Sequence, residues 1–131
     1  MALSGSEFRH VQVRRIYEDP APSDGIRVLV DRIWPRGVSK ARAHLDEWCK
    51  DIAPSAELRT WYHHDPKLFE EFADRYRVEL IEPGRAALLV HLRHLAERQM
   101  LTLLTATRAA DISEAAVLAD LIASSIASPD S

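Results

Sequence analysis

The chain has 131 residues, 47% of them hydrophobic, which is the length of one domain with a single core. Acidic residues outnumber Lys and Arg by 20 to 17, so the formal net charge of -3 excludes the strong positive field of non-specific nucleic-acid binders. The single cysteine, Cys49, excludes an intramolecular disulfide and favours the reducing cytoplasm. Because no apolar run approaches the roughly 20 residues of a membrane helix, we expect no membrane partner.

Both ends of the chain are predicted to lie outside the folded domain. Residues 1–9 contain Gly-Ser-Glu-Phe, which two adjoining cloning sites encode, and they lack a signal-peptide pattern. We interpret them as a disordered vector remnant. Residues 124–131 are small and polar, which predicts a flexible tail. The single domain is therefore expected to span residues 10–123.

Two strands are predicted in the first half of the domain. β-branched residues indicate a strand at 11–17, and the apolar run at 26–31 indicates a strand covered on both faces. Since only a short loop connects them, we expect these strands to pair antiparallel. Ser39 is the predicted N-cap of a short helix. Residues 45–52 are ambiguous between a strand and an irregular segment.

Helices dominate the next part of the chain. Ser55 is the predicted N-cap of a helix that ends near Tyr62. Asp65 followed by Pro66 is typical of another helix start. Large apolar residues then recur at helical spacing between 69 and 80, which predicts a buried stripe.

The last third of the chain indicates the fold class. A helix at 85–98, a strand at 101–105 and a final helix capped by Ser113 form one helix–strand–helix unit. Together with the earlier strands, this pattern predicts a small, three-layer-like α/β domain. Its short sheet is expected to be mostly parallel or mixed and to be flanked by helices.

Charged, hydroxyl and aromatic side chains follow two of the predicted strands. If these strands lie parallel, their carboxyl ends open on one side of the sheet, where α/β proteins bind ligands. Guanidinium groups suit phosphate and carboxylate, and the N-terminus of the last helix would add amide donors. We therefore expect a pocket for a small anionic molecule. The candidate ligand-binding residues are Arg32, Trp34, Arg36, Thr105, Thr107 and Arg108.

Asp31 is the one candidate for a catalytic group, and a weak one. It would handle a proton if burial raised its pKa, or it would orient an arginine. Alternatively, it only caps a turn or pairs with Arg32 or Arg36. Whether the protein is an enzyme stays open, and no cofactor is indicated.

The histidines favour no metal site. Adjacent side chains on a helix diverge, so His63 and His64 are unsuited to share an ion. We expect His64 to bond a backbone carbonyl or to lean over the pocket, and we count it as a candidate ligand contact. His91 and His94 lie one turn apart, but a zinc ion needs further ligands that the sequence does not place.

Three segments resemble one known family. Residues 24–40, which contain the string Asp-Arg-Ile-Trp-Pro-Arg-Gly, are similar to the DUF488 family in its YeaO-like branch, and so are residues 45–80 and 101–108. The resemblance runs in one register from about residue 11 to residue 121. Since members of this family are uncharacterised α/β domains, the resemblance implies a fold more than a reaction.

The sequence departs from the family pattern after the last strand. The family usually shows Tyr-Ala-Ala-Arg-Asp where this chain has Thr-Ala-Thr-Arg-Ala at 105–109, and Asn-His where it has Ser113 and Glu114. The arginine remains, whereas the tyrosine, acid and histidine do not. The resemblance therefore implies a shared anion pocket rather than a shared reaction.

Two alternatives stay open. The chain would be a regulatory or nucleic-acid-binding module if the arginines contacted phosphates, although its acidity and its lack of a helix-turn-helix pattern disfavour this. It would be a structural protein without a ligand if the arginines only paired with acids. The sequence does not indicate an oligomeric state.

Overall fold

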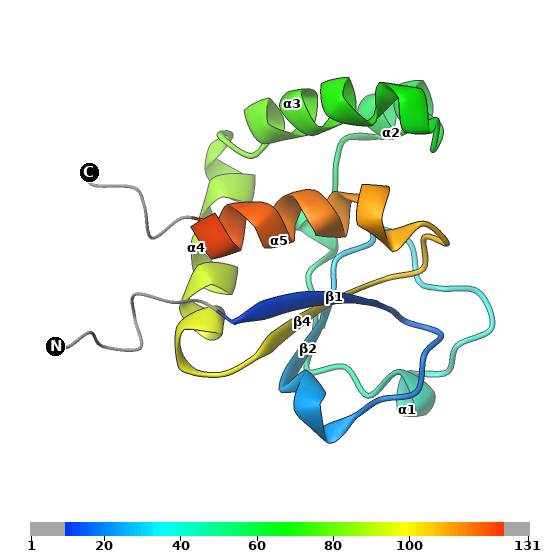
Figure 1. Cartoon of the computed structure of the whole chain (residues 1–131), viewed down its shortest axis with the longest axis vertical. Coiled ribbons are helices and arrows are strands. Elements are labelled where there is room, and N and C mark those ends of the chain that lie inside the picture. The colour runs from blue at the N-terminus through cyan, green and yellow to red at the C-terminus, as the bar shows by residue number, and fades with distance from the viewer. Residues whose placement is uncertain (1–9, 125–131) are drawn as a thin grey trace, which may run out of the picture.

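A parallel sheet lies at the centre of the computed structural model, which describes residues 10–124 (Figure 1). In this part of the chain the sheet has four strands in the order β1-β4-β2-β3. Every pairing is parallel. Their bounds are β1 Val11–Arg15, β2 Ile26–Leu29, β3 Glu47–Trp48 and β4 Leu101–Thr105. The predicted vector remnant, and the predicted tail beyond residue 124, lie outside the described residues.

The expected antiparallel pairing of the first two strands is wrong. β4 lies between them, with Leu103 opposite Val13 on one side and Val28 on the other. A parallel return usually needs a crossover helix, but a five-residue strand is only about 17 Å long. Residues 16–25, at up to about 3.4 Å each, can therefore return the chain along the whole strand without a crossover helix.

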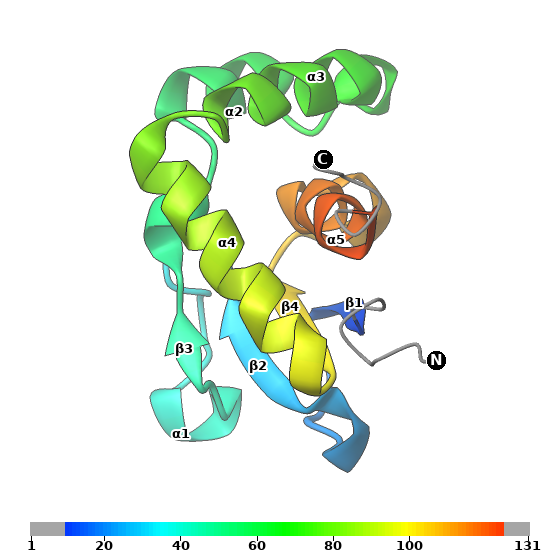
Figure 2. The same cartoon turned by 90° about the vertical axis from the view of Figure 1, so that its left-hand side faces the viewer.

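The helices α2 to α5 lie on one face of the sheet in two layers. α4 (Pro83–Arg98) and α5 (Glu114–Ser124) lie nearer the sheet, and α2 (Ala56–Tyr62) and α3 (Phe69–Glu79) lie beyond them (Figure 2). The larger core lies between these layers and includes Tyr76, Phe72, Leu92, Leu118 and Ile122. None of the helices in the described part of the chain is long and apolar enough to cross a membrane.

The opposite face of the sheet is covered by the segment that follows β2. This segment includes α1 (Lys40–Ala43), which lies below the sheet in Figure 1, with α5 above it. A smaller core forms here around Leu29, Val38 and Leu104. Trp34 and Trp48 pack edge-on beside it, with ring centroids 5.2 Å apart. The protein is therefore the small α/β domain that the sequence predicts, with helices or loop segments packed on both faces of its sheet.

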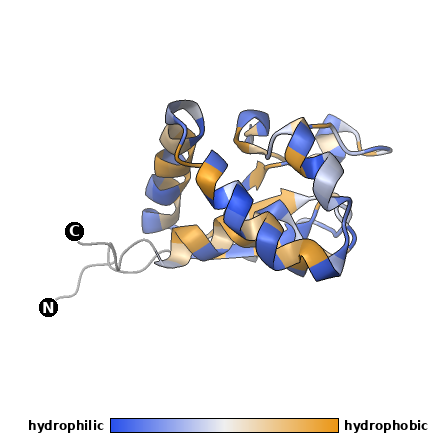
Figure 3. Ribbon diagram, turned by 90° about the horizontal axis from the view of Figure 1, so that it is seen from above, coloured by the Kyte–Doolittle hydropathy of each residue, from blue (hydrophilic) through white to orange (hydrophobic). Residues whose placement is uncertain are grey.

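Local capping explains where several helices begin. The side chains of Ser39, Ser55 and Asp65 accept the backbone N–H groups of Arg42, Leu58 and Lys67, as predicted for N-caps. Hydrophobic and hydrophilic residues alternate along the helices, as they do in amphipathic helices (Figure 3). The ambiguous segment at 45–52 forms the short edge strand β3 and a 3-10 turn (Lys50–Ile52). α4 begins at Pro83 rather than at residue 85, because proline suits the first position of a helix.

Candidate functional site

A cavity of about 450 Å³ opens beyond the carboxyl ends of β2 and β4. Most of its wall comes from the residues after β2 and β4, from α2 and the loop after it, and from the start of α5, while Tyr17, Ala53, Pro54 and Phe72 complete the lining. The polar residues of the lining are Tyr17, Asp31, Arg32, Arg36, Arg59, Tyr62, His64, Thr107, Ser113 and Glu114. A volume of this size is typical of sites for small molecules.

Asp31 is fixed by donors from the neighbouring strand. Thr105 Oγ1 donates to its Oδ1 at 2.8 Å, and the Ala106 N–H donates to its Oδ2 at 2.7 Å. Trp48 Nε1 donates to the backbone carbonyl of Asp31 at 2.8 Å. Both carboxylate oxygens therefore accept a hydrogen bond from the end of β4 or the residue after it, which holds the carboxylate at one wall of the cavity.

Glu114, the first residue of α5, forms a carboxyl pair with Asp31. Burial raises the pKa of Glu114 well above its usual range, and the hydrogen bond to Asp31 and the negative charge of Asp31 raise this pKa further. Arg59 acts in the opposite direction but does not outweigh them. The raised pKa favours the neutral form of Glu114 beside Asp31.

Among the described residues, three arginines line the same cavity. Arg32 is exposed and makes a loose ion pair with Asp51 at 3.7 Å. Arg36 is also exposed, and its carbonyl accepts the Tyr17 hydroxyl at 3.0 Å. Arg59 comes from α2, and its Nε is buried without a hydrogen-bond partner in the described part of the chain. A buried donor without a partner is rare in folded proteins, so this atom is a candidate contact for a ligand.

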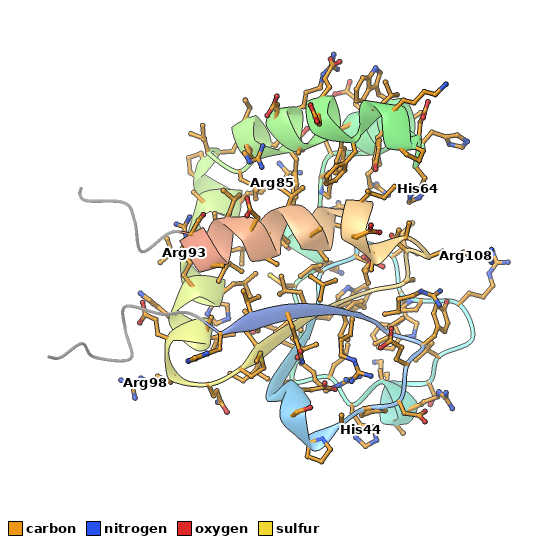
Figure 4. All side chains as sticks on the ribbon, in the orientation of Figure 1. His44, His64, Arg85, Arg93, Arg98 and Arg108 are labelled. Atoms are coloured by element: carbon orange, nitrogen blue, oxygen red, sulfur yellow. The ribbon has the colours of Figure 1, made fainter. Side chains whose placement is uncertain are left out.

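The structure brings most of the sequence-predicted site residues together. Arg32, Trp34, Arg36, Thr107, His64 and the catalytic candidate Asp31 lie in the lining of the cavity. Thr105 is buried behind the cavity and contacts Asp31. Arg108 is not in the lining. Its side chain points away from the molecule, on the loop after β4 (Figure 4).

Sequence reasoning missed Arg59 and Glu114. Arg59 lies on a short helix that also carries Glu57, and nothing in its spacing distinguishes it from a solvated side chain. Glu114 had a signal, because it stands at a departure from the resembled family. Thr105 stands at another, and both side chains contact Asp31. The departures therefore gather around one carboxylate.

His64, which lines the cavity, is the second of two consecutive residues in the left-handed region. His63 has φ 47° and ends α2, and His64 follows with φ 56°. Such conformations cost non-glycine residues energy and often occur at functional sites. Tyr62 supports this corner, since its hydroxyl donates to the Ile112 carbonyl at 2.7 Å and its ring stacks on Phe72.

The other histidines make different contacts. His91 bonds Glu47 at 2.9 Å across to β3. In residues 10–124, no group of three or more His, Cys, Asp or Glu side chains is placed to hold a metal ion.

Cys49 is expected to be an unreactive thiol. It is buried, and burial together with the negative charges of Glu47 and Asp51 raises its pKa to about 11. At pH 8 the thiolate fraction is then about a hundredfold below that of an ordinary cysteine. We expect alkylation by iodoacetamide, followed by mass spectrometry, to be slower by at least that factor in the native protein than in urea. Similar rates in both states would show an accessible thiolate.

Comparison with known proteins identifies the family. Residues 10–131 match the family described as the inactive DUF488-N3 subclade. The chain belongs to the DUF488 family. An uncharacterised protein of Mycobacterium tuberculosis strain H37Rv is 54% identical over 112 residues, which are 86% of this chain and 92% of the relative. YeaO of Escherichia coli K12, also uncharacterised, is 39% identical over 115 residues, 88% of this chain and 98% of YeaO. No solved structure matches this DUF488 protein.

Proposed function

We propose that this DUF488 protein binds a small molecule with a phosphate or carboxylate group in the cavity at the strand ends. The observation that carries the proposal is Arg59, whose Nε is buried in the cavity wall without a partner among the described residues. Arg32 and Arg36 line the same space. Guanidinium groups bind oxyanions through several charge-assisted hydrogen bonds, which are stronger than neutral ones.

The charge balance of the lining supports an anionic ligand. The three arginines carry one positive charge each. Asp31 and Glu114 are the carboxyl groups of the lining, so they carry at most two negative charges, and the raised pKa of Glu114 favours fewer. The cavity is therefore net positive although the chain as a whole has a net charge of -3. A local field of this sign attracts anions. Trp34 contributes an aromatic wall next to the arginines.

Binding without turnover agrees better with the lining than catalysis does. The matching subclade is described as inactive. Cys49 does not line the cavity, and the hydroxyl of Ser113 donates to the Ala110 carbonyl at 2.6 Å. Asp31 is held by Thr105 and Ala106, which suits a structural anchor as well as a ligand contact. For the compartment, we keep the cytoplasm as part of the proposal, because Cys49 is a free thiol.

The test compares an arginine in the cavity wall, Arg59, with an exposed arginine outside it, Arg108. Anion binding is measured by calorimetry and thermal shift with inorganic phosphate, propane-1-sulfonate, sugar phosphates, nucleoside monophosphates and dicarboxylates. We expect Arg59→Gln to weaken the binding of the best anion about tenfold or more, because a hydrogen bond to a charged group is worth about 1.5–3 kcal/mol. The matched control Arg108→Gln removes an exposed guanidinium outside the cavity and should change Kd less than about twofold.

Two outcomes would contradict the proposal. One is a melting temperature and a tryptophan fluorescence spectrum that no anion changes. The other is an equal loss of affinity in Arg59→Gln and Arg108→Gln, which would indicate attraction by surface charge rather than a site.

A further inference from the structure

The cavity has acidic and basic groups side by side. The carboxyl pair Asp31–Glu114 forms part of its wall, and Arg59 is close enough to Glu114 to lower the pKa of that group. Arg59 nevertheless makes no ion pair within 4.0 Å in the described part of the chain, so no carboxylate there neutralises its positive charge. An anion bound at Arg59 therefore lies next to two carboxyl groups.

A pair of adjacent carboxyl groups needs a positive charge between them. Two such groups do not ionise together easily, and in the free protein a proton fills this role. Both carboxylate oxygens of Asp31 already accept a hydrogen bond, from Thr105 Oγ1 and from the Ala106 N–H. Glu114 is thus the member of the pair whose proton a ligand can replace.

The other groups around Glu114 do not supply that charge. Burial raises the pKa of Tyr62 on α2 and of Tyr76 on α3, and an ionised Glu114 would raise both further. Their hydroxyls donate to the backbone carbonyls of Ile112 and Ile52, at 2.7 and 2.6 Å. Arg59 on α2 is the cation whose charge acts on Glu114, and Arg32, Arg36 and His64 line the same cavity.

We propose that the cavity takes a short ampholyte, which is a molecule with an anionic group for Arg59 and a protonated amine for the Asp31–Glu114 pair. This inference rests on the proposed function and narrows its class of ligand. On binding, the ligand ammonium donates hydrogen bonds to the Glu114 carboxylate. The proton that Glu114 held passes to solvent, so one proton is released for each amine bound. Because Arg59 and Glu114 are neighbours, only a few bonds separate the two ends of the ligand.

The experiment uses 3-aminopropane-1-sulfonate and propane-1-sulfonate. These ligands differ in the amine alone, and the sulfonate keeps one negative charge across the accessible pH range. We expect the amine ligand to bind the wild-type protein about tenfold more tightly or better, as a charge-assisted contact allows. Calorimetry in two buffers of different ionisation enthalpy should count about one released proton for the amine ligand, and none for propane-1-sulfonate.

Glu114→Gln tests the carboxyl group directly. The amide keeps the shape of the neutral acid but cannot become a carboxylate, so the advantage of the amine ligand should fall below about twofold. Propane-1-sulfonate should bind this variant as well as it binds the wild type. Glu70→Gln, which removes an exposed acid on α3, is the matched control and should keep the full advantage.

The outcomes separate this inference from the function on which it rests. Equal binding of the two sulfonates to the wild type, or an unchanged advantage in Glu114→Gln, overturns the ampholyte and leaves the anion site intact. Binding of neither sulfonate overturns both. Propylamine that binds as tightly as the aminosulfonate supports the carboxyl contact and contradicts the anion site. If Glu114→Gln does not fold, the proton count of the wild-type protein decides by itself.

Discussion

Replacing Asp24 with asparagine is expected to destabilise the protein by about 3–5 kcal/mol, because it leaves a buried arginine without its counter-ion. Asp24 is 1% exposed and Arg27 5% exposed, and the two form an ion pair. Arg14 Nη1 donates to both oxygens of Asp24, at 2.7 and 3.0 Å, and the Ala21 N–H donates to Oδ2 at 3.0 Å. One carboxylate thus connects β1, β2 and the loop between them.

The effect extends to α1 through Arg27. Its Nη2 donates to the Ala43 carbonyl at 2.8 Å and its Nε to the His44 carbonyl at 3.0 Å. Without the charge of Asp24, the guanidinium stays buried and only these neutral acceptors remain. Asparagine keeps the shape of the side chain, so the measured loss reports the charge rather than a cavity.

Urea denaturation of Asp24→Asn beside Asp19→Asn is the measurement. Asp19 is 93% exposed and lies 3.8 Å from Arg42, so its substitution should change the free energy of unfolding by less than about 0.5 kcal/mol. A loss in Asp24→Asn of less than about 1 kcal/mol would show that the buried cluster contributes little net charge stabilisation.

The loss of stability in Asp24→Asn relative to the wild type is expected to depend on pH. Burial by itself would raise the pKa of Asp24, but the Ala21 N–H and the guanidiniums of Arg14 and Arg27 outweigh it and hold the pKa below its usual value of 3.8. A depressed pKa contributes stability that is fully present above the ordinary value and is lost as pH falls through the folded-state value. The difference between wild type and Asp24→Asn should therefore be constant near neutrality and shrink below about pH 4.

Gly25→Ala is the second substitution with a large expected effect, a loss of about 3 kcal/mol or more. Gly25 has φ 62°, where an L residue is strained by about 1–3 kcal/mol. A Cβ at this position would lie 2.2 Å from the Met100 carbonyl oxygen. That oxygen accepts the Ile26 N–H at 2.9 Å, so relief of the clash would disturb the pairing of β2 with β4.

The remaining glycines of the described chain provide graded controls for unfolding measurements. Gly37 also has a positive φ, of 78°, but a Cβ added there would meet no atom within 4 Å, so Gly37→Ala should cost only the backbone strain of about 1 kcal/mol. Gly84 lies in α4 with open space around it, and Gly84→Ala should stabilise by about 0.5–1 kcal/mol. If Gly25→Ala cost no more than Gly37→Ala, the close approach to Met100 would not be a constraint.

Local patterns in the sequence predicted much of the secondary structure correctly. Ser39, Ser55 and Asp65 act as N-caps because capping depends on a side chain and on backbone groups two or three residues away. β2 was predicted from its apolar run at 28–30, which reflects burial on both faces of the sheet. Residues of the motif at 31–37 line the cavity, because residues that follow a strand must emerge at its carboxyl end.

Only the tertiary structure decided which strands are neighbours and which charges meet. β4 lies between β1 and β2 although most of the chain separates it from both, and no local pattern encodes that pairing. Arg59 and Glu114 join Asp31 in the lining of the cavity from two helices, whereas Arg108 points away from the cavity although it follows the strand that Thr105 ends. The reason is physical: a short motif determines backbone conformation over a few residues, but the environment of a charge depends on every element packed around it.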